Sequence, residues 1–450
     1  MPTPAQQAAP SAQKSGGISM VAAAALVAGN MIGTGIFTSL GFQVLDIKTG
    51  FGIVLIWVVG GVMAFCGALC YAELGASMPR SGGEYHLLGT VWHPLAGFLA
   101  GWLSMTVAFA APVALAASAF GTYLANSIFD GDPMARFACA LAVLLAVTFV
   151  HLINVRVSGR FQIAATLLKI TLLIVLIAAG LAVSPAQPLS FTPAPADDGL
   201  LLRGEFIVAL FFVSYSYCGW NAAIYVVGDM RNPQRDLPLA LLLGTGFVTL
   251  LYVLVNVAFL RAAPISDLSG APDAGLVAAR HLFGERSGSL MGVFIAAGLV
   301  STISAMMWAG PRVAKTIGED WAVFSPLAAV TRHGVPALAT LLQTAIALGL
   351  LTFGGFADVL TYIEFTLALS TFLTVAGVFW LRWKRPSLPR PFEAWGYPIT
   401  PAVYLLFTGY VLVRFATDPE QWVKSLLGFA TIAAGAVIYV LSPKKLINGG

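Results

Sequence analysis

The sequence predicts an all-α polytopic membrane protein, and three observations carry this prediction. Of the 450 residues, 58% are hydrophobic and only 10% are charged, whereas a soluble domain usually carries about 25% charged residues. The apolar residues form runs long enough to cross a bilayer as helices, which takes about 20 residues each. The period-2 alternation that a membrane β-barrel would need does not occur.

Twelve apolar runs are long enough to be membrane-spanning helices, and the connections between them are too short to form a soluble domain. Residues 1–17 are rich in Pro, Ala, Gln and Ser, and we expect them to form a disordered cytoplasmic tail rather than a signal peptide. The expected spans cover residues 18–41, 51–78, 92–125, 134–151, 156–183, 204–228, 238–262, 288–317, 335–353, 356–382, 398–416 and 422–441.

Two proline-rich stretches divide these spans into groups of five, five and two. The first stretch, 183–203, also contains the Asp197–Asp198 pair, and the second stretch is 384–398. We therefore expect a first five-helix repeat, a second five-helix repeat and two peripheral helices, which cover residues 18–183, 204–382 and 398–441.

Lysine and arginine residues are distributed unequally between the two sides of the predicted bundle. With the N-terminus inside, fifteen of them fall on the cytoplasmic side and eight on the outer side, while Lys169 lies within a span. Cytoplasmic loops carry the excess of Lys and Arg in membrane proteins. We therefore expect a multi-pass protein of the cell membrane, the bacterial inner membrane, with both termini in the cytoplasm.

The four cysteines indicate neither a metal site nor a redox motif. Cys66, Cys70, Cys139 and Cys218 all lie inside apolar spans, and their spacing matches no metal-ligand or CxxC pattern. We expect them to be buried, unreactive thiols. No metal and no cofactor is expected.

The first span is interrupted in its middle by Gly29-Asn30-Met31-Ile32-Gly33-Thr34-Gly35. Glycine and asparagine are poor helix formers, and in lipid a broken backbone is tolerated only where it is buried in protein or lines a cavity. The break frees amide groups at the positive end of the following half-helix, which can receive a carboxylate. The alternative is that these glycines only allow close packing of helices.

The sixth span, the first of the second group of five, is interrupted by Ser214-Tyr215-Ser216-Tyr217-Cys218-Gly219-Trp220-Asn221. Interrupted segments at corresponding positions are typical of a transporter site built from inverted repeats. A half-helix that ends near Ser214–Ser216 presents carbonyl groups at its negative end, which suits an ammonium group. Together the two breaks would bind the carboxylate and the amine that all α-amino acids share. Taken alone, the aromatic residues here would more often be core or interfacial residues.

Three segments can be compared with a known family. The first is Gly29-Asn30-Met31-Ile32-Gly33-Thr34-Gly35-Ile36-Phe37. The second is Tyr71-Ala72-Glu73-Leu74 with Pro79-Arg80-Ser81-Gly82-Gly83-Glu84-Tyr85. The third is Tyr217, Gly219, Trp220 and Asn221, followed by Asn232-Pro233 and Leu237-Pro238. In this order they resemble the amino acid–polyamine–organocation superfamily over nearly the whole chain, and the third segment looks most like its L-type amino acid transporter branch.

This resemblance implies the LeuT-like fold, with twelve transmembrane helices arranged as two inverted five-helix repeats plus two. It implies that the substrate carboxylate binds the backbone amides at the first break, in Ile32, Gly33, Thr34 and Gly35. The amine would bind carbonyl groups at the second break, and the residues implied there are Phe212, Val213, Tyr215, Cys218 and Asn221. Tyr215 matches an aromatic gate and Asn221 a supporting asparagine. The family often has phenylalanine at the gate and glycine at position 218, so the preferred substrate side chain is not carried over.

Lys169 and Glu364 are the charged residues that lie clearly inside predicted spans. Lys169 is nine residues beyond Arg160, roughly 13 Å deep at ~1.5 Å per residue. The resemblance matches it to a fifth-span lysine beside the first break, where its ammonium group would take the place of a sodium ion, so we expect sodium-independent transport. Two alternatives stay open, a lysine that extends toward the interface and a lysine that carries a proton.

Glu364 matches no feature of the family. It could face the pocket and handle a cation or proton, or simply pair with a hydroxyl such as that of Thr361.

These observations predict a secondary active amino acid transporter that works by alternating access. No phosphate-binding loop indicates that ATP drives it, and no set of nucleophile, base or metal ligands inside the bilayer indicates an enzyme. The L-type resemblance favours exchange, whereas Glu364 favours proton symport. The alternatives are a polyamine or cationic amino acid transporter, a channel, and an amino-acid sensor that does not transport.

The expected partners are a small-molecule amino acid and the lipid bilayer. No basic groove or aromatic platform indicates nucleic acid. The resemblance leaves an accessory subunit open by analogy with eukaryotic relatives, but no cysteine lies in an outer loop to anchor one covalently, and we do not expect one.

Overall fold

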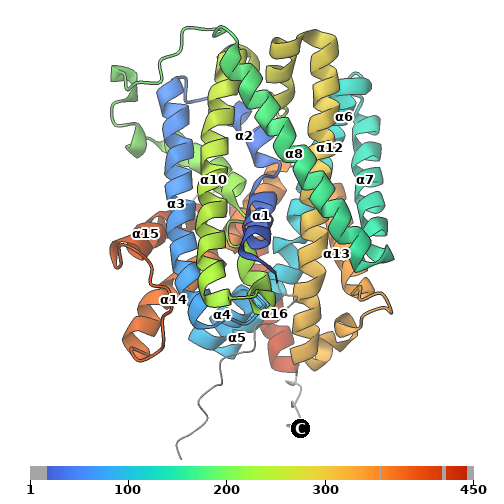
Figure 1. Ribbon diagram of the computed structural model, residues 1–450, viewed down its shortest axis with the longest axis vertical. Coiled ribbons are helices and arrows are strands. Elements are labelled where there is room, and N and C mark those ends of the chain that lie inside the picture. The colour runs from blue at the N-terminus through green and yellow to red at the C-terminus, as the bar shows by residue number, and fades with distance from the viewer. Residues whose placement is uncertain (1–17, 354–355, 418–421, 443–450) are drawn as a thin grey trace, which may run out of the picture.

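The computed structural model describes residues 18–353, 356–417 and 422–442, which form a bundle of helices aligned along its long axis (Figure 1). The tail predicted over residues 1–17 lies outside these residues. Within the described part of the chain no strand forms, and the only β pairing is one isolated bridge. The predicted all-α class is confirmed.

The helices follow the predicted spans, with ends that mostly differ by a few residues. The first group comprises α1 Met20–Met31, α2 Gly35–Gln43, α3 Gly50–Ser77, α5 Pro94–Leu103, α6 Ala110–Ile128, α7 Pro133–Ile153 and α8 Val155–Ala182. The second comprises α9 Gly204–Tyr217, the 3-10 segment η4 Ala222–Asp229, α10 Pro233–Ala262, α12 Ala274–Asp320, α13 Ala337–Phe353 and α14 Phe356–Lys384. The last long helices are α15 Ile399–Thr417 and α16 Trp422–Leu441, and short helices in the connections are α4 Glu84–Val91 and α11 Ile265–Leu268.

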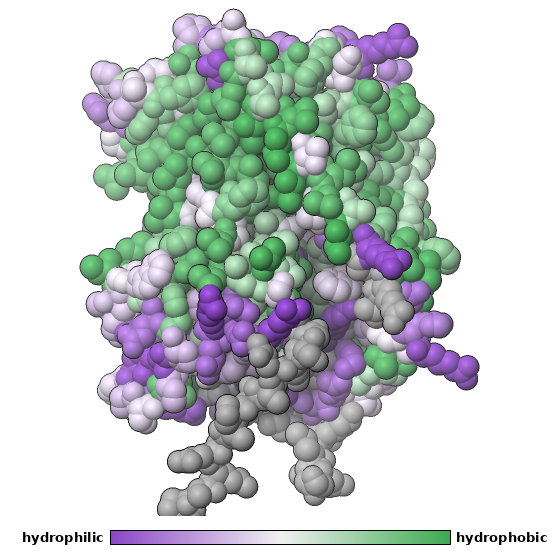
Figure 2. Space-filling model, viewed as in Figure 1, coloured by the Kyte–Doolittle hydropathy of each residue, from purple (hydrophilic) through white to green (hydrophobic). Residues whose placement is uncertain are grey.

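Eight helical segments of the described chain are long and apolar enough to cross a membrane, and nine if α1 and α2 form one broken span. The apolar parts of α13, α15 and α16 are shorter, so the count of twelve spans stays a prediction. On the face that Figure 2 shows, a broad band of hydrophobic residues crosses the middle of the molecule, and hydrophilic residues gather toward its two ends. Such a belt is expected where the sides of a helical bundle face hydrocarbon.

Side-chain caps account for where several long helices begin. Ser19, Thr49, Asp132 and Asn154 each accept a hydrogen bond from an amide in the first turn of α1, α3, α7 and α8, respectively. These residue types are preferred at this position because they satisfy an amide that has no partner within the helix.

The third and eighth predicted spans, 92–125 and 288–317, are not single regular helices. In the third segment, α5 and α6 are joined through η1 Ser104–Ala108, which has π-helical geometry. In the eighth, α12 begins at Ala274 rather than near residue 288, and Gly284 bends it with φ of 78°. Glycine adopts this left-handed conformation without the steric cost that a Cβ would bring.

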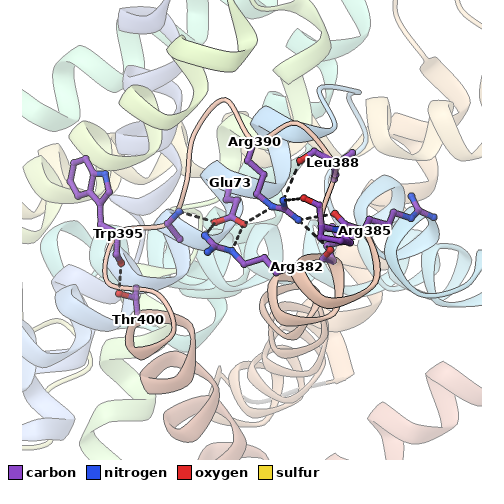
Figure 3. Close-up of polar contacts among 10 residues, drawn as sticks. Glu73, Arg382, Arg385, Leu388, Arg390, Trp395 and Thr400 are labelled. Carbon is purple, nitrogen blue, oxygen red and sulfur yellow. Dashed lines mark hydrogen bonds and ion pairs between the residues drawn. The ribbon is translucent and has the colours of Figure 1, made fainter.

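A buried charge cluster joins α3 to the end of α14 and to the loop that follows it (Figure 3). The carboxylate of Glu73, only 3% exposed, accepts hydrogen bonds from Arg382 Nε at 2.9 Å and Nη2 at 2.7 Å, and from the amide of Ala394 at 2.8 Å. Arg390 Nε lies 3.6 Å from the same carboxylate, and its guanidinium group also donates to the carbonyls of Leu381 and Arg385. The loop between α14 and α15 is thereby tied to α3.

We expect Glu73→Gln to destabilise the protein by about 3 kcal/mol. Removing one partner of a buried ion pair costs about 3–5 kcal/mol because the other charge stays buried. The side chain of Arg382 is 19% exposed, so we expect a loss at the lower end of this range. The measurement is denaturant unfolding of the purified protein in detergent. The control is Glu319→Gln, which breaks the more exposed pair with Lys315 and should cost less than about 1 kcal/mol. Equal losses in the two variants would contradict the prediction.

Candidate functional site

A cavity of about 440 Å³ lies where the two interrupted helices meet. Its wall includes residues of the break between α1 and α2 and of the break between α9 and η4. Ile18, Ser81 and Lys315 also line it, so the cavity extends to the end of the molecule at which the described chain begins. Among the described residues, the connections at the opposite end, 44–49 and 263–273, contribute nothing to the wall. The site is therefore reached from one end of the bundle.

The two breaks lie against each other. Helices α1 and α2 are bent by 40° relative to each other. Helix α9 ends at Tyr217, slightly beyond the predicted Ser214–Ser216, and the chain passes through a turn before η4 begins. In this turn Gly219 has φ of 100°, and a Cβ there would lie 3.0 Å from the carbonyl carbon of Asn30. Only glycine combines this conformation with so close an approach.

Side chains of α2 and α9 hold the half-helices together beside the cavity. The hydroxyls of Thr34 and Tyr215 lie 3.1 Å apart, and those of Ser39 and Ser216 lie 3.0 Å apart. Gly35 packs so closely that a Cβ added to it would lie 2.2 Å from Ser216 Oγ and 2.7 Å from Ser216 Cα. The substrate-facing ends of the two half-helices thus depend on each other for their position.

Tyr252 of α10 bridges the two breaks. Its ring is fully buried, and its hydroxyl oxygen lies 2.5 Å from the carbonyl oxygen of Met31 and 2.8 Å from that of Ser216. The single hydroxyl proton is shared between the last carbonyl of α1 and a terminal carbonyl of α9. Both carbonyls would otherwise be buried without a partner, which costs about 1–3 kcal/mol each.

Lys169 of α8 lies directly behind the first break. Its side chain is 0% exposed, and its ammonium group donates to the carbonyl of Gly29 at 3.0 Å and to that of Ile32. Thr302 Oγ1 lies 3.5 Å from the same nitrogen and donates to the Ile32 carbonyl at 3.3 Å. The negative end of α1 therefore faces the terminal nitrogen of Lys169.

Because side chains satisfy these carbonyls of the first break, the groups left for a ligand are its amides. Gly33, Thr34 and Gly35 line the cavity. In the described structure no acceptor is found for the amides of Thr34 and Gly35, and Thr34 provides no side-chain cap to α2. Amides at the start of a helix point along the positive end of its dipole and favour an anion.

The structure brings together most of the residues implied for the site. Besides the three of the first break, the predicted residues Tyr215, Cys218 and Asn221 line the cavity. Ile32, Phe212 and Val213 do not line it, and the Phe212 carbonyl already accepts hydrogen bonds from the hydroxyls of Ser39 and Ser216. The prediction that this carbonyl binds an amine is thus not matched by its surroundings. The side chain of Glu364 lies outside the described part of the structure.

Three residues of this region were not singled out for the site from the sequence. Tyr252 and Thr302 lie in the middle of apolar helices, where one hydroxyl carries no recognisable pattern. Glu84 belongs to a segment quoted for its resemblance, yet its position in a connection gave no reason to place it near a cavity. Its carboxylate in fact accepts hydrogen bonds from Tyr71, Asn221 and Tyr225.

Broken helices that meet at a cavity inside a bundle of apolar helices define the class of the protein, a membrane transporter. The comparison with known families agrees with this assignment and refines it. The chain belongs to the amino acid permease family, which matches residues 18–445.

Its relatives are amino acid transporters. The chain is 30% identical over 433 residues to the large neutral amino acids transporter small subunit 2 of Oryctolagus cuniculus, covering 94% of this chain and 80% of the relative. It is 28% identical over 438 residues to the Asc-type amino acid transporter 1 of Mus musculus, with the same coverage. It is 27% identical to the human cystine/glutamate transporter over 94% of this chain and 84% of the relative.

These comparisons confirm the superfamily, the L-type branch, the helical membrane class and the prediction that the chain is a transporter rather than an enzyme. They oppose one expectation. The relative from Oryctolagus cuniculus is named a small subunit, which speaks against the expectation that no accessory subunit is involved. The missing outer cysteine bears only on a disulfide link, because subunits also associate without covalent bonds.

Proposed function

We propose that this chain is a secondary active, sodium-independent transporter of neutral amino acids that works by alternating access. The observation that carries the proposal is the pair of broken helices at one cavity. The free amides of Thr34 and Gly35 would bind the substrate α-carboxylate, and the end of α9 would bind its α-amine, as expected from the opposite signs of the two helix ends. We further propose that residues 18–183 and 204–382 are the two inverted repeats.

The surroundings of Lys169 support sodium independence. The carbonyl oxygens of Gly29 and Ile32, which would suit a small cation, already accept hydrogen bonds from the ammonium group of Lys169. A sodium ion at this place would have to displace the side chain of Lys169 from both carbonyl oxygens. Exchange is proposed as the mode because the relatives include the L-type branch, and proton symport is the alternative that the experiment below separates.

The lining of the cavity supports a neutral substrate. Phe109, Pro112, Met306, Ala309 and Leu367 give the wall a largely apolar character. The charged residues of the wall, Asp229, Arg312 and Lys315, gather toward the open end. A polyamine or cationic amino acid would require unpaired carboxylates in the wall, and among the described residues the acidic side chain of the wall, Asp229, lies close enough to Arg312 to interact with its charge.

We place the protein in a cell membrane, the bacterial inner membrane, with both termini in the cytoplasm. The excess of Lys and Arg on the side of the N-terminus supports this orientation. In that orientation the cavity opens to the cytoplasm, and the structure represents an inward-facing state. An accessory subunit would be recognised as a second polypeptide that copurifies from the native membrane.

Uptake into proteoliposomes tests the proposal. The purified chain is reconstituted with or without an internal amino acid pool, and a panel of amino acids competes with one labelled neutral amino acid, with and without sodium and a proton gradient. We expect saturable, stereoselective uptake that depends on the internal pool and not on sodium. Absence of uptake under all conditions would contradict the proposal. Uptake driven by the proton gradient alone would show that the mode is proton symport and not exchange.

The role of Glu364 is tested by the same assay at several values of pH. If Glu364 handles a proton, Glu364→Gln should change the pH profile of uptake. Identical profiles for the variant and the original protein would assign Glu364 a purely structural role.

A further inference from the structure

Glu84 is a buried carboxylate beside the cavity that the proposed mechanism does not use. It is the first residue of α4 and is only 4% exposed. A negative charge in the first turn of a helix is favoured by the helix dipole. Among the described residues no Lys, Arg or His lies within ion-pair distance of it.

Three uncharged donors surround the Glu84 carboxylate. The hydroxyl of Tyr71 lies 2.9 Å from Oε1, the side-chain amide nitrogen of Asn221 lies 2.6 Å from Oε1, and the hydroxyl of Tyr225 lies 2.5 Å from Oε2. An ionised carboxylate only accepts hydrogen bonds, so all three groups must donate. Hydrogen bonds to an ionised acceptor are roughly twice as strong as neutral ones. The site is therefore built to hold Glu84 and its donors in one arrangement.

The loop that carries Glu84 is held tightly against η4. Gly83 has φ of 57°, and a Cβ there would lie 2.2 Å from the ring of Tyr225. Ser81 Oγ accepts a hydrogen bond from the amide of Gly228 at 3.0 Å. Since both Gly228 and Tyr225 belong to η4, Glu84 has little freedom to move relative to Asn221, the residue that precedes this segment.

This arrangement fixes which way the Asn221 side chain points. If its carbonyl oxygen faced Glu84, two acceptors would meet without a proton between them. The amide nitrogen must face Glu84, and the carbonyl oxygen Oδ1 then points away from it. Asn221 lines the cavity, and among the described residues no donor to Oδ1 is found.

We propose that Glu84 is a positioning residue that holds Asn221 with its carbonyl oxygen available to an N–H group of the substrate. This inference rests on the proposed function, in which the cavity binds an amino acid. Glu84 itself does not line the cavity, whereas its hydrogen-bond partners Asn221 and Tyr225 do, so Glu84 acts through them. The carbonyl oxygen of Asn221 would accept a hydrogen bond from the protonated amine of the substrate.

The test compares Glu84→Ala and Glu84→Gln by the KM and maximal rate of amino acid uptake in proteoliposomes. We expect Glu84→Ala to raise KM about tenfold, because Asn221 loses the acceptor that orients it. Glu84→Gln keeps one carbonyl oxygen for Asn221 and should raise KM by less than about threefold. The matched control is Asp273→Ala. It removes another buried carboxylate, which accepts a hydrogen bond from the side chain of Asn126 at 2.9 Å. Asp273 does not line the cavity, so the KM of this variant should not change.

A reciprocal exchange keeps the inference testable if Glu84→Ala does not fold. Asn221→Asp places two carboxylates face to face and should abolish measurable uptake. Adding Glu84→Gln to Asn221→Asp supplies a donor opposite the new carboxylate and should restore uptake in part. Failure of that rescue, or an unchanged KM in folded Glu84→Ala, would overturn the inference. Both results would leave the proposed function standing, because that proposal is contradicted only if the unmodified protein transports no amino acid.

Discussion

Lys169→Met reduces amino acid uptake at least tenfold. Methionine keeps most of the side-chain volume but cannot donate a hydrogen bond, so the carbonyl oxygens of Gly29 and Ile32 lose their shared donor. Leaving a buried carbonyl without a partner costs about 1–3 kcal/mol, and 1.4 kcal/mol corresponds to a factor of ten in an equilibrium constant. The loss destabilises the end of α1 in the arrangement that forms the cavity. The measurement is the initial rate of uptake by reconstituted protein, with exchange measured in parallel.

The control for Lys169 is a second lysine whose side chain donates to a carbonyl group at the end of a helix. Lys48→Met removes an ammonium group that donates to the carbonyl of Val44 at 2.8 Å, at the end of α2 that faces away from the cavity. Its uptake should stay within about twofold of the original protein. Normal uptake, normal exchange and an unchanged pH profile in Lys169→Met would defeat the assigned role.

Gly35→Ala also abolishes most transport, for a steric reason. The added methyl group would lie 2.2 Å from Ser216 Oγ and 2.7 Å from Ser216 Cα, so α2 and α9 must move apart. Overpacking of this kind costs about 1–3 kcal/mol in stability. It also separates Thr34 from Tyr215 and Ser39 from Ser216. We expect at least a tenfold loss of uptake and a lower thermal midpoint in detergent.

Two further variants show whether backbone approach is the cause. Ser216→Gly added to Gly35→Ala removes the hydroxyl but leaves the Cα atom in place, so the double variant should recover little activity. Gly246→Ala in α10 meets no atom within 4 Å, and alanine is a better helix former than glycine, so its uptake and stability should be maintained. Full recovery in the double variant would show that the added methyl group collides with the side chain of Ser216 and not with its backbone.

Local sequence properties account for how much of the fold could be predicted. Each apolar side chain in a span contributes separately to the free energy of transfer into the bilayer, so the position of a span follows from its own composition. The two breaks were also visible, because glycine and asparagine disfavour a helix wherever it lies. The exact end of α9 at Tyr217 and the bend at Gly284 were not, since hydrogen bonds to neighbouring segments decide where a helix ends.

Some of the residues predicted for the candidate site line the cavity and others do not. Gly33, Thr34 and Gly35 line the cavity because amides freed by a break must face a polar space. Phe212 and Val213 lie behind the wall instead, because the rotation of α9 about its axis is set by its contacts with α2 and α3. A sequence pattern places a residue in a helix but does not fix that rotation when the helix is apolar on every side.

Residues close together in the chain were enough to predict the class of the protein, the approximate spans, the two broken helices and a lysine inside the fifth span. The side chains that satisfy the broken ends became apparent only in the folded structure. Tyr252 joins Met31 to Ser216, Glu84 orients Asn221, and Glu73 ties α3 to the loop after α14. Most of these partners are more than a hundred residues apart. The role of a polar group buried between helices depends on the hydrogen-bond partner that the fold places opposite it.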